Sequence, residues 1–164
     1  MTNTVESNAP SVFVPQRFEP LRGLVQSTGT KNAPFKAMYD LLTFGAVLGL
    51  RERKKGEPSS SGADRISTHS EVKLDNPDRI ERTLIDIISV VSAGSDDVLF
   101  PGRQQDRVDT FMAYACGGLD FILALVGEGR TPRDAVDAIL RGTVEKDTSA
   151  TELRASIAGL ANDV

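Results

Sequence analysis

Asp64, Glu71 and Lys73, with His69 between them, are the residues whose types and spacing most suggest catalysis. An acid followed by Glu-x-Lys is the residue set of a magnesium-dependent nuclease, in which two carboxylates hold the metal ion and the lysine steadies the attacking water. That chemistry needs the groups on adjoining strands of a sheet, and few segments of this chain are typical of strands. A charged loop exposed to solvent explains the same residues, and we favour that interpretation.

The remaining reactive side chains form no pattern typical of an enzyme. The chain has one cysteine, Cys116, and one histidine, so a disulfide framework and a metal site built from several cysteines or histidines are excluded. No Gly-x-x-x-x-Gly-Lys segment occurs, which argues against an ATPase. We interpret Cys116 as a small buried hydrophobe, and Asp96-Asp97 as part of a turn rather than a magnesium site. The sequence therefore predicts no catalytic residue, no metal and no cofactor.

The best candidate for a binding function is a basic run formed by Arg51, Arg53, Lys54 and Lys55. Four cations within five residues could contact several phosphates of a DNA backbone, or an acidic surface of a partner protein. No aromatic residue interrupts the run, so stacking of single-stranded bases is not supported. A solvated helix end without a binding role explains the same residues equally well.

Charge is unevenly distributed along the chain. The formal net charge is −4, from 19 Lys and Arg against 23 Asp and Glu. Residues 1–55 carry eight basic and four acidic residues, which leaves 11 basic and 19 acidic residues for 56–164. The two parts therefore carry +4 and −8. Such an asymmetry can orient a molecule against DNA or a charged protein, although it also serves simply to keep a small protein soluble.

Apolar residues at spacings of three and four predict an all-α fold, a compact bundle of four to five helices. The helices are expected at about residues 34–55, 76–94, 104–126 and 131–142, with shorter helical segments at 17–26 and 150–160. Residues 1–11 are expected to be a disordered tail, and residues 56–76, rich in serine and glycine, a long loop. Residues 12–164 would form a single helical domain.

Capping residues indicate where these helices begin and end. Asn32 ahead of Pro34, and Asn76 ahead of Pro77, combine a favourable N-cap with a proline in the first turn. The basic run is expected in the last turn of the 34–55 helix, where cations complement the helix dipole. In the 17–26 segment, Pro20 argues for a helix start near that residue.

Glycines inside two of the predicted helices indicate close helix packing. Gly45 and Gly49, four residues apart, leave a smooth strip on which another helix can lie. Gly117-Gly118 costs about 2 kcal/mol of helix propensity, so a close backbone approach or a kink is expected there. We take Gly45, Gly49, Tyr114, Gly117, Gly118 and Leu119 as candidate helix-packing residues, within the chain or between subunits.

The composition also bears on localisation. We find no apolar run of about 18 residues, so a membrane-spanning helix is not expected. The first 11 residues are polar and lack the pattern of a secretory signal. A reducing, cytoplasmic setting fits the single cysteine.

Two stretches resemble a known family. Residues 35–50, FKAMYDLLTFGAVLGL, resemble the FKxMxDxxxFxAxLG segment of small proteins associated with bacterial DNA phosphorothioation (Dnd) systems. Residues 111–119, FMAYACGGL, are similar to the FxxYAxGGL segment of those proteins. The resemblance places a family-like core at 12–126, interrupted by the 56–76 loop and followed by a helical extension at 127–164.

The resemblance implies a helical accessory protein encoded with a phage-defence or DNA-modification operon, and it carries over no catalytic residue. In such systems the chemistry is expected on larger partners, such as ATPases, nucleases or sulfur-transfer enzymes. We therefore predict a non-enzymatic accessory or scaffold subunit that binds a larger defence-system protein, and that could also contact the DNA backbone or form a homo-oligomer. The alternatives are a small magnesium-dependent nuclease and a DNA-binding regulator of the same operon.

Overall fold

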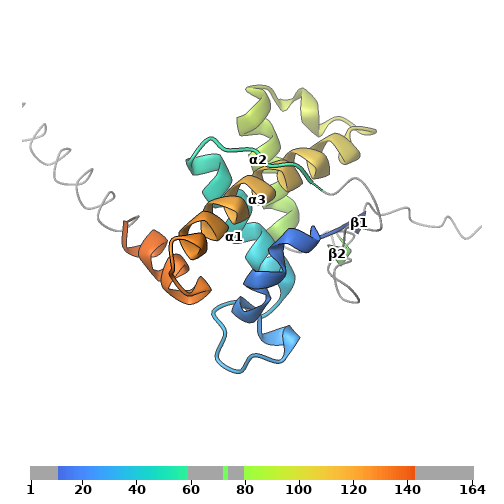
Figure 1. Ribbon diagram of the computed structural model, residues 1–164. Helices are drawn as coiled ribbons and strands as arrows, with labels where there is room; N and C mark the ends of the chain where they lie inside the picture. Colours follow the sequence, from blue (N-terminus) through green and yellow to red (C-terminus); the bar gives the residue numbers. More distant parts are fainter. Residues whose placement is uncertain (1–10, 59–71, 74–79, 143–164) are drawn as a thin grey trace, which may run out of the picture.

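Helix α3 (Gln104–Gly127) is the central element of the fold, and the other long helices pack against it (Figure 1). The computed structural model describes residues 11–58, 72–73 and 80–142. Within these residues, α3 contacts α1 (Met38–Arg51) and α2 (Ile80–Ala93), as well as the 3-10 helices η1 (Gln16–Leu24) and η3 (Asp96–Leu99). The prediction of an all-α fold is confirmed.

In the described part of the chain, the sheet consists of two short strands, β1 (Ser11–Val12) and β2 (Val72–Lys73). They pair antiparallel, with Ser11 opposite Lys73 and Val12 opposite Val72. The pairing places the residues just before η1 beside the end of the stretch expected to form a long loop. Two residues in each strand are too few to change the fold class.

The segment around Pro20 is a 3-10 helix rather than an α-helix. It begins at Gln16, four residues before the predicted start, and contains Pro20 in its interior. Its buried residues are Phe18, Leu21 and Leu24. Their spacing of three matches the three residues per turn of a 3-10 helix, which lines them up on one side facing the core. A proline disrupts an α-helix, and the chain takes the tighter form here.

Helix α1 begins at Met38, so the predicted start near Pro34 is wrong by four residues. Phe35 lies in an extended segment instead, where its N–H donates to the Leu24 carbonyl at 3.1 Å and its carbonyl accepts from Gln26 N–H at 2.8 Å. Asn32 is not the cap, and it has a left-handed φ of 65°. The Asp40 carboxylate accepts from the backbone N–H of Ala37 and Lys36, at 2.9 and 3.1 Å, and caps the helix.

The boundaries of α2 and α3 follow the sequence more closely. Gly94, with a left-handed φ of 68°, ends α2 as predicted. The predicted start of α2 at Asn76 lies outside the described residues. Helix α3 matches its predicted range to within one residue and is unbroken through its two central glycines. An ion pair at 2.9 Å between Arg107 Nε and Asp86 Oδ1 joins the two helices.

A further helical segment at 132–142 begins as the sequence predicts. Thr131 Oγ1 accepts from Asp134 N–H at 3.2 Å and donates to its carboxylate at 2.6 Å. Ala135, Val136 and Ile139 of this segment join the hydrophobic core. The predicted helical segment at 150–160, residues 1–10 of the predicted tail and most of the 56–76 loop lie outside the described residues. Ser11, the last residue of the predicted disordered tail, pairs with Lys73 in the sheet instead.

Helix α3 also corrects the expectation that no segment is apolar enough to span a membrane. It is long enough for this role, and its most apolar 18-residue window has a mean hydropathy of 1.6. Half of that window is nevertheless buried inside the molecule. Since α1, α2 and η1 all pack on α3, its apolar character is accounted for by its place at the centre of a helical core.

Candidate functional site

Helices α1 and α3 approach each other so closely that only glycine fits at several contact positions. A Cβ atom added to Gly118 would overlap the carbonyl oxygen of Gly45, and one added to Gly49 would overlap the carbonyl oxygen of Tyr114. A Cβ on Gly45 would lie 2.9 Å from the Ala115 carbonyl oxygen. The obstacles are backbone atoms, which cannot rotate away as a side chain could. A close backbone approach, without a break in α3, therefore accounts for Gly117-Gly118.

The six candidate helix-packing residues all lie in the interior of the chain. Gly45, Gly49, Gly117 and Gly118 are buried, and so are Tyr114 and Leu119. The surfaces they form are already occupied by other parts of the same molecule, which for Gly117 is the backbone of Lys54 and Lys55. A binding surface must therefore be sought among exposed residues.

The basic run lies where α1 ends and the chain turns along α3. Helix α1 ends at Arg51, so Arg53, Lys54 and Lys55 lie beyond the last turn in which they were predicted. Arg53 N–H donates to the Leu50 carbonyl at 3.1 Å, and Lys54 N–H donates to the Gly49 carbonyl at 2.8 Å. These two bonds form a Schellman motif with Arg53 in the left-handed position, at a φ of 53°. We call residues 51–55 the basic segment.

Replacing Arg53 by glycine is expected to stabilise the fold by about 0.5–1 kcal/mol, because glycine adopts the left-handed conformation without the steric cost that an L side chain incurs. Thermal or urea unfolding measures the change. Lys54→Gly is the matched control: Lys54 has no left-handed φ, so the substitution should destabilise the protein. Equal destabilisation by both substitutions would show that Arg53 is unstrained.

A strained residue that is also exposed and charged suggests a role outside folding.

Contacts with α3 hold the basic segment in place. Gly56 N–H donates to the Ala113 carbonyl at 2.8 Å. Lys54 Nζ lies 5.1 Å from the centre of the Phe121 ring, and Lys55 Nζ lies 4.9 Å from that of Tyr114. Arg51 forms an ion pair with Glu52 at 2.7 Å. All four basic residues of the segment are exposed, so it presents cations to solvent from a fixed backbone.

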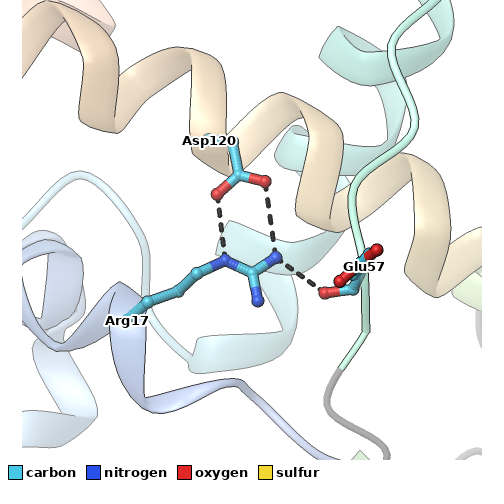
Figure 2. Close-up of polar contacts among 3 residues, drawn as sticks. All are labelled: Arg17, Glu57 and Asp120. Atoms are coloured by element: carbon cyan, nitrogen blue, oxygen red, sulfur yellow. Dashed lines mark hydrogen bonds and ion pairs between the residues drawn. The ribbon is translucent and has the colours of Figure 1, made fainter.

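Arg17 connects the N-terminal region to α3 and to the residues that follow the basic segment (Figure 2). Its Nε and Nη2 donate to the Asp120 carboxylate at 3.0 and 3.3 Å, and Nη2 also donates to the Glu57 carbonyl at 2.7 Å. The guanidinium lies 4.4 Å from the centre of the Phe18 ring. The sequence carries no local signal for this cluster, because Glu57 and Asp120 are 40 and 103 residues away from Arg17.

Cys116 lies on α3 next to this cluster and is fully buried. Burial raises the pKa of its thiol to about 11, since the anion would lose its hydration, and the positive charge of Arg17 offsets part of that effect. At neutral pH the thiol is therefore protonated. The thiolate is the nucleophilic form, so Cys116 is poorly suited to covalent catalysis.

Iodoacetamide should therefore label Cys116 in the folded protein at least about 100-fold more slowly at pH 7.5 than in the urea-unfolded chain, whose thiol has a pKa of about 8.5. The labelling rate of the folded protein should keep rising up to about pH 11 instead of levelling off near pH 9. Over the same range the folded state loses stability, because the unfolded thiol ionises first. Mass spectrometry of timed samples measures both rates. Similar rates in the folded and unfolded chains would contradict a buried, protonated thiol.

The other candidates from the sequence add no catalytic centre among the described residues. Asp64, His69 and Glu71 lie outside them, and Lys73 is described only through the backbone of β2. Asp96 and Asp97 form the first turn of η3, where Asp97 N–H donates to Ser95 Oγ at 3.2 Å. Across residues 11–58, 72–73 and 80–142, no group of three or more His, Cys, Asp or Glu residues is placed to hold a metal ion.

The comparisons with known proteins identify the family. The model of the family DNA sulphur modification system-associated protein 4 matches residues 12–157. The chain belongs to this family. The match confirms the resemblance to Dnd-associated proteins, and it continues past residue 126 through the helical segment at 132–142. A search of curated proteins and a search of solved structures each found no match.

The two motifs that suggested a DNA sulphur modification system-associated protein now have a physical explanation. The first motif supplies Asp40, which caps α1, and Gly49, which lies against α3. The second supplies Gly117 and Gly118. The backbone of Lys54 lies close against Gly117, and the backbone of Gly45 lies close against Gly118. Both motifs thus supply residues that let α1 and the basic segment pack closely against α3.

Proposed function

We propose that this DNA sulphur modification system-associated protein is a non-enzymatic, cytoplasmic accessory subunit that binds a larger protein of the same system. The basic segment is its contact surface. The observation that carries the proposal is the exposure of four cations on a backbone fixed against α3. Family membership supports the association with a DNA sulphur modification system.

A fixed backbone favours a binding role for the basic segment. The Schellman bonds and the bond from Gly56 N–H to Ala113 restrict its conformation before any partner is present. A preorganised segment loses less conformational entropy on binding than a flexible one, so more of the interaction energy contributes to affinity. The charged groups themselves are exposed, and the fold does not depend on burying them.

The charges around the basic segment favour a protein partner over DNA. Glu52 pairs with Arg51, and Asp120 pairs with Arg17 close by. A protein surface of mixed charge can accommodate carboxylates among its cations, whereas a DNA backbone repels each of them. The net charge of −4 adds to that repulsion.

Co-expression with the other proteins of a DNA sulphur modification system tests the proposal. Each of those proteins is tagged in turn, and the complex is purified by affinity and size-exclusion chromatography. We expect this chain to co-elute with one larger protein. We also expect the purified chain alone neither to nick plasmid DNA with magnesium nor to hydrolyse ATP. Absence of any complex, or turnover that tracks with this chain, would contradict the proposal.

Titration with duplex DNA at low salt separates the remaining alternatives. The proposal predicts weak binding without sequence preference, or none. Tight binding to one sequence upstream of the operon would instead favour a regulator. Tight binding without sequence preference that weakens with salt and disappears when the basic segment is neutralised would instead assign that segment to phosphate contacts.

A further inference from the structure

A groove of about 260 Å³ lies beside the basic segment, between the end of α1, the second half of α3 and the helical segment at 132–142. Its lining includes four apolar side chains, those of Phe121, Leu125, Ala138 and Ile139. It also includes three charged side chains, those of Arg51, Glu52 and Arg130. The groove therefore combines an apolar surface with guanidinium groups in one small space.

The size of the groove indicates what it can hold. Sites for small molecules and cofactors usually have volumes of about 300–1,000 Å³. A volume of about 260 Å³ is below that range, and suits one or two side chains of another protein better than a nucleotide.

The charge of the groove is positive. Two guanidiniums face one carboxylate, and that carboxylate, on Glu52, is already paired with Arg51. Lys54 lies outside this lining, with its Nζ 5.1 Å from the centre of the Phe121 ring. A ligand that brings a carboxylate to Arg130 would therefore meet a complementary charge, and a guanidinium can bind both carboxylate oxygens at once.

We infer that this groove binds a short segment of the partner protein that combines an aliphatic or aromatic side chain with a neighbouring Asp or Glu. The inference rests on the proposed function, and it identifies where on the accessory subunit the partner is anchored. An apolar side chain would cover the four apolar residues, while the carboxylate would reach the guanidiniums. A DNA backbone fits less well, because it has no apolar group to occupy the groove.

Selection from a random peptide library displayed on phage, with the full chain as the immobilised target, tests this inference. The most enriched sequence is then made as a labelled peptide, and its Kd is measured by fluorescence anisotropy. We expect the enriched sequences to share a Leu, Ile or Phe next to Asp or Glu. Ala138→Glu, which fills the groove and adds a negative charge, should weaken peptide binding at least tenfold.

Two matched controls separate the groove from general effects of charge. Leu140→Glu introduces the same residue in the same helical segment, at an exposed position outside the groove lining, and should change the Kd less than twofold. Arg130→Gln should weaken the peptide several-fold, whereas Arg133→Gln, on a different hollow of the surface, should not. Circular dichroism confirms that each variant is folded.

Three results would overturn the inference. The first is a peptide that binds Ala138→Glu as tightly as the original chain. The second is enrichment of sequences without acidic residues. The third is loss of peptide binding when duplex DNA is added in equimolar amount, which would assign the groove to DNA. If no peptide is enriched while the chain still co-elutes with a protein of its system, the groove inference fails and the proposed function stands.

Discussion

Gly118→Ala is expected to destabilise the protein by about 2 kcal/mol. The added methyl group would overlap the carbonyl oxygen of Gly45, so α1 and α3 would have to move apart over their whole contact. Overpacking of this kind costs about 1–3 kcal/mol or more, and a clash with backbone belongs at the upper end. The better helix propensity of alanine returns at most about 1 kcal/mol. For a chain of this length the melting temperature should fall by roughly 4–8 °C.

Gly127→Ala is the matched control for that substitution. Gly127 is the last residue of the same helix, and an added Cβ there would meet nothing within 4 Å. The control should leave the melting temperature unchanged or raise it slightly, because only the gain in helix propensity remains. Differential scanning calorimetry measures both variants. A Gly118→Ala protein as stable as Gly127→Ala would contradict the close α1–α3 contact.

Neutralising the basic segment should weaken the complex with the partner protein about 100-fold. The variant replaces Arg51, Arg53, Lys54 and Lys55 by glutamine, which keeps much of each side chain while removing the charge. An exposed ion pair contributes up to about 1 kcal/mol, so four lost pairs amount to about 3 kcal/mol, or two orders of magnitude in Kd. Isothermal titration calorimetry against the co-eluting protein measures the change. The unfolding free energy should fall by no more than about 2 kcal/mol, because the variant loses the contacts of the two lysines with Phe121 and Tyr114.

A second fourfold variant controls for the change in net charge. It carries glutamine at four exposed basic positions elsewhere on the surface: Lys31, Lys36, Arg103 and Arg133. Long-range attraction is screened beyond about 10 Å at moderate salt, so this variant should change the Kd less than about threefold. Equal losses of affinity in the two variants would mean that net charge, and not the basic segment, attracts the partner.

Local sequence signals predicted those parts of the fold that are determined locally. The cap formed by Thr131, with a proline next to it, marks the start of the 132–142 segment, and Gly94 ends α2 in a left-handed conformation. Helix α3 has a long apolar stripe and clear ends, and its predicted range holds. The motif pair at 35–50 and 111–119 also gave the right family.

Tertiary contacts determine the parts that the sequence did not predict. Pro34 offers a helix start, yet Phe35 pairs with the backbone at Leu24 and Gln26, and this delays α1 until Met38. At the C-terminal end of α1, the apolar and basic residues of 34–55 predict one continuous helix. The chain instead turns after Arg51, because the next residues pack their backbone against Gly117. Neither contact leaves a local trace in the sequence.

The candidate site was predictable in composition but not in shape. Four cations within five residues are visible in the sequence, and so is the need for a close contact at Gly117-Gly118. Their connection is not visible, because the rings under the two lysines come from residues about 60 positions further along the chain. The Arg17 cluster and the apolar groove likewise combine residues from three separate segments.

Zero-length cross-linking of the complex with a carbodiimide is the most direct test that the basic segment is the contact surface. The reagent joins a lysine amine to a carboxylate only where the two groups are in contact, and mass spectrometry identifies both residues. We expect cross-links from Lys54 or Lys55 to aspartate or glutamate of the larger protein. Cross-links from Lys31 or Lys36 to that protein, with none from Lys54 or Lys55, would contradict it.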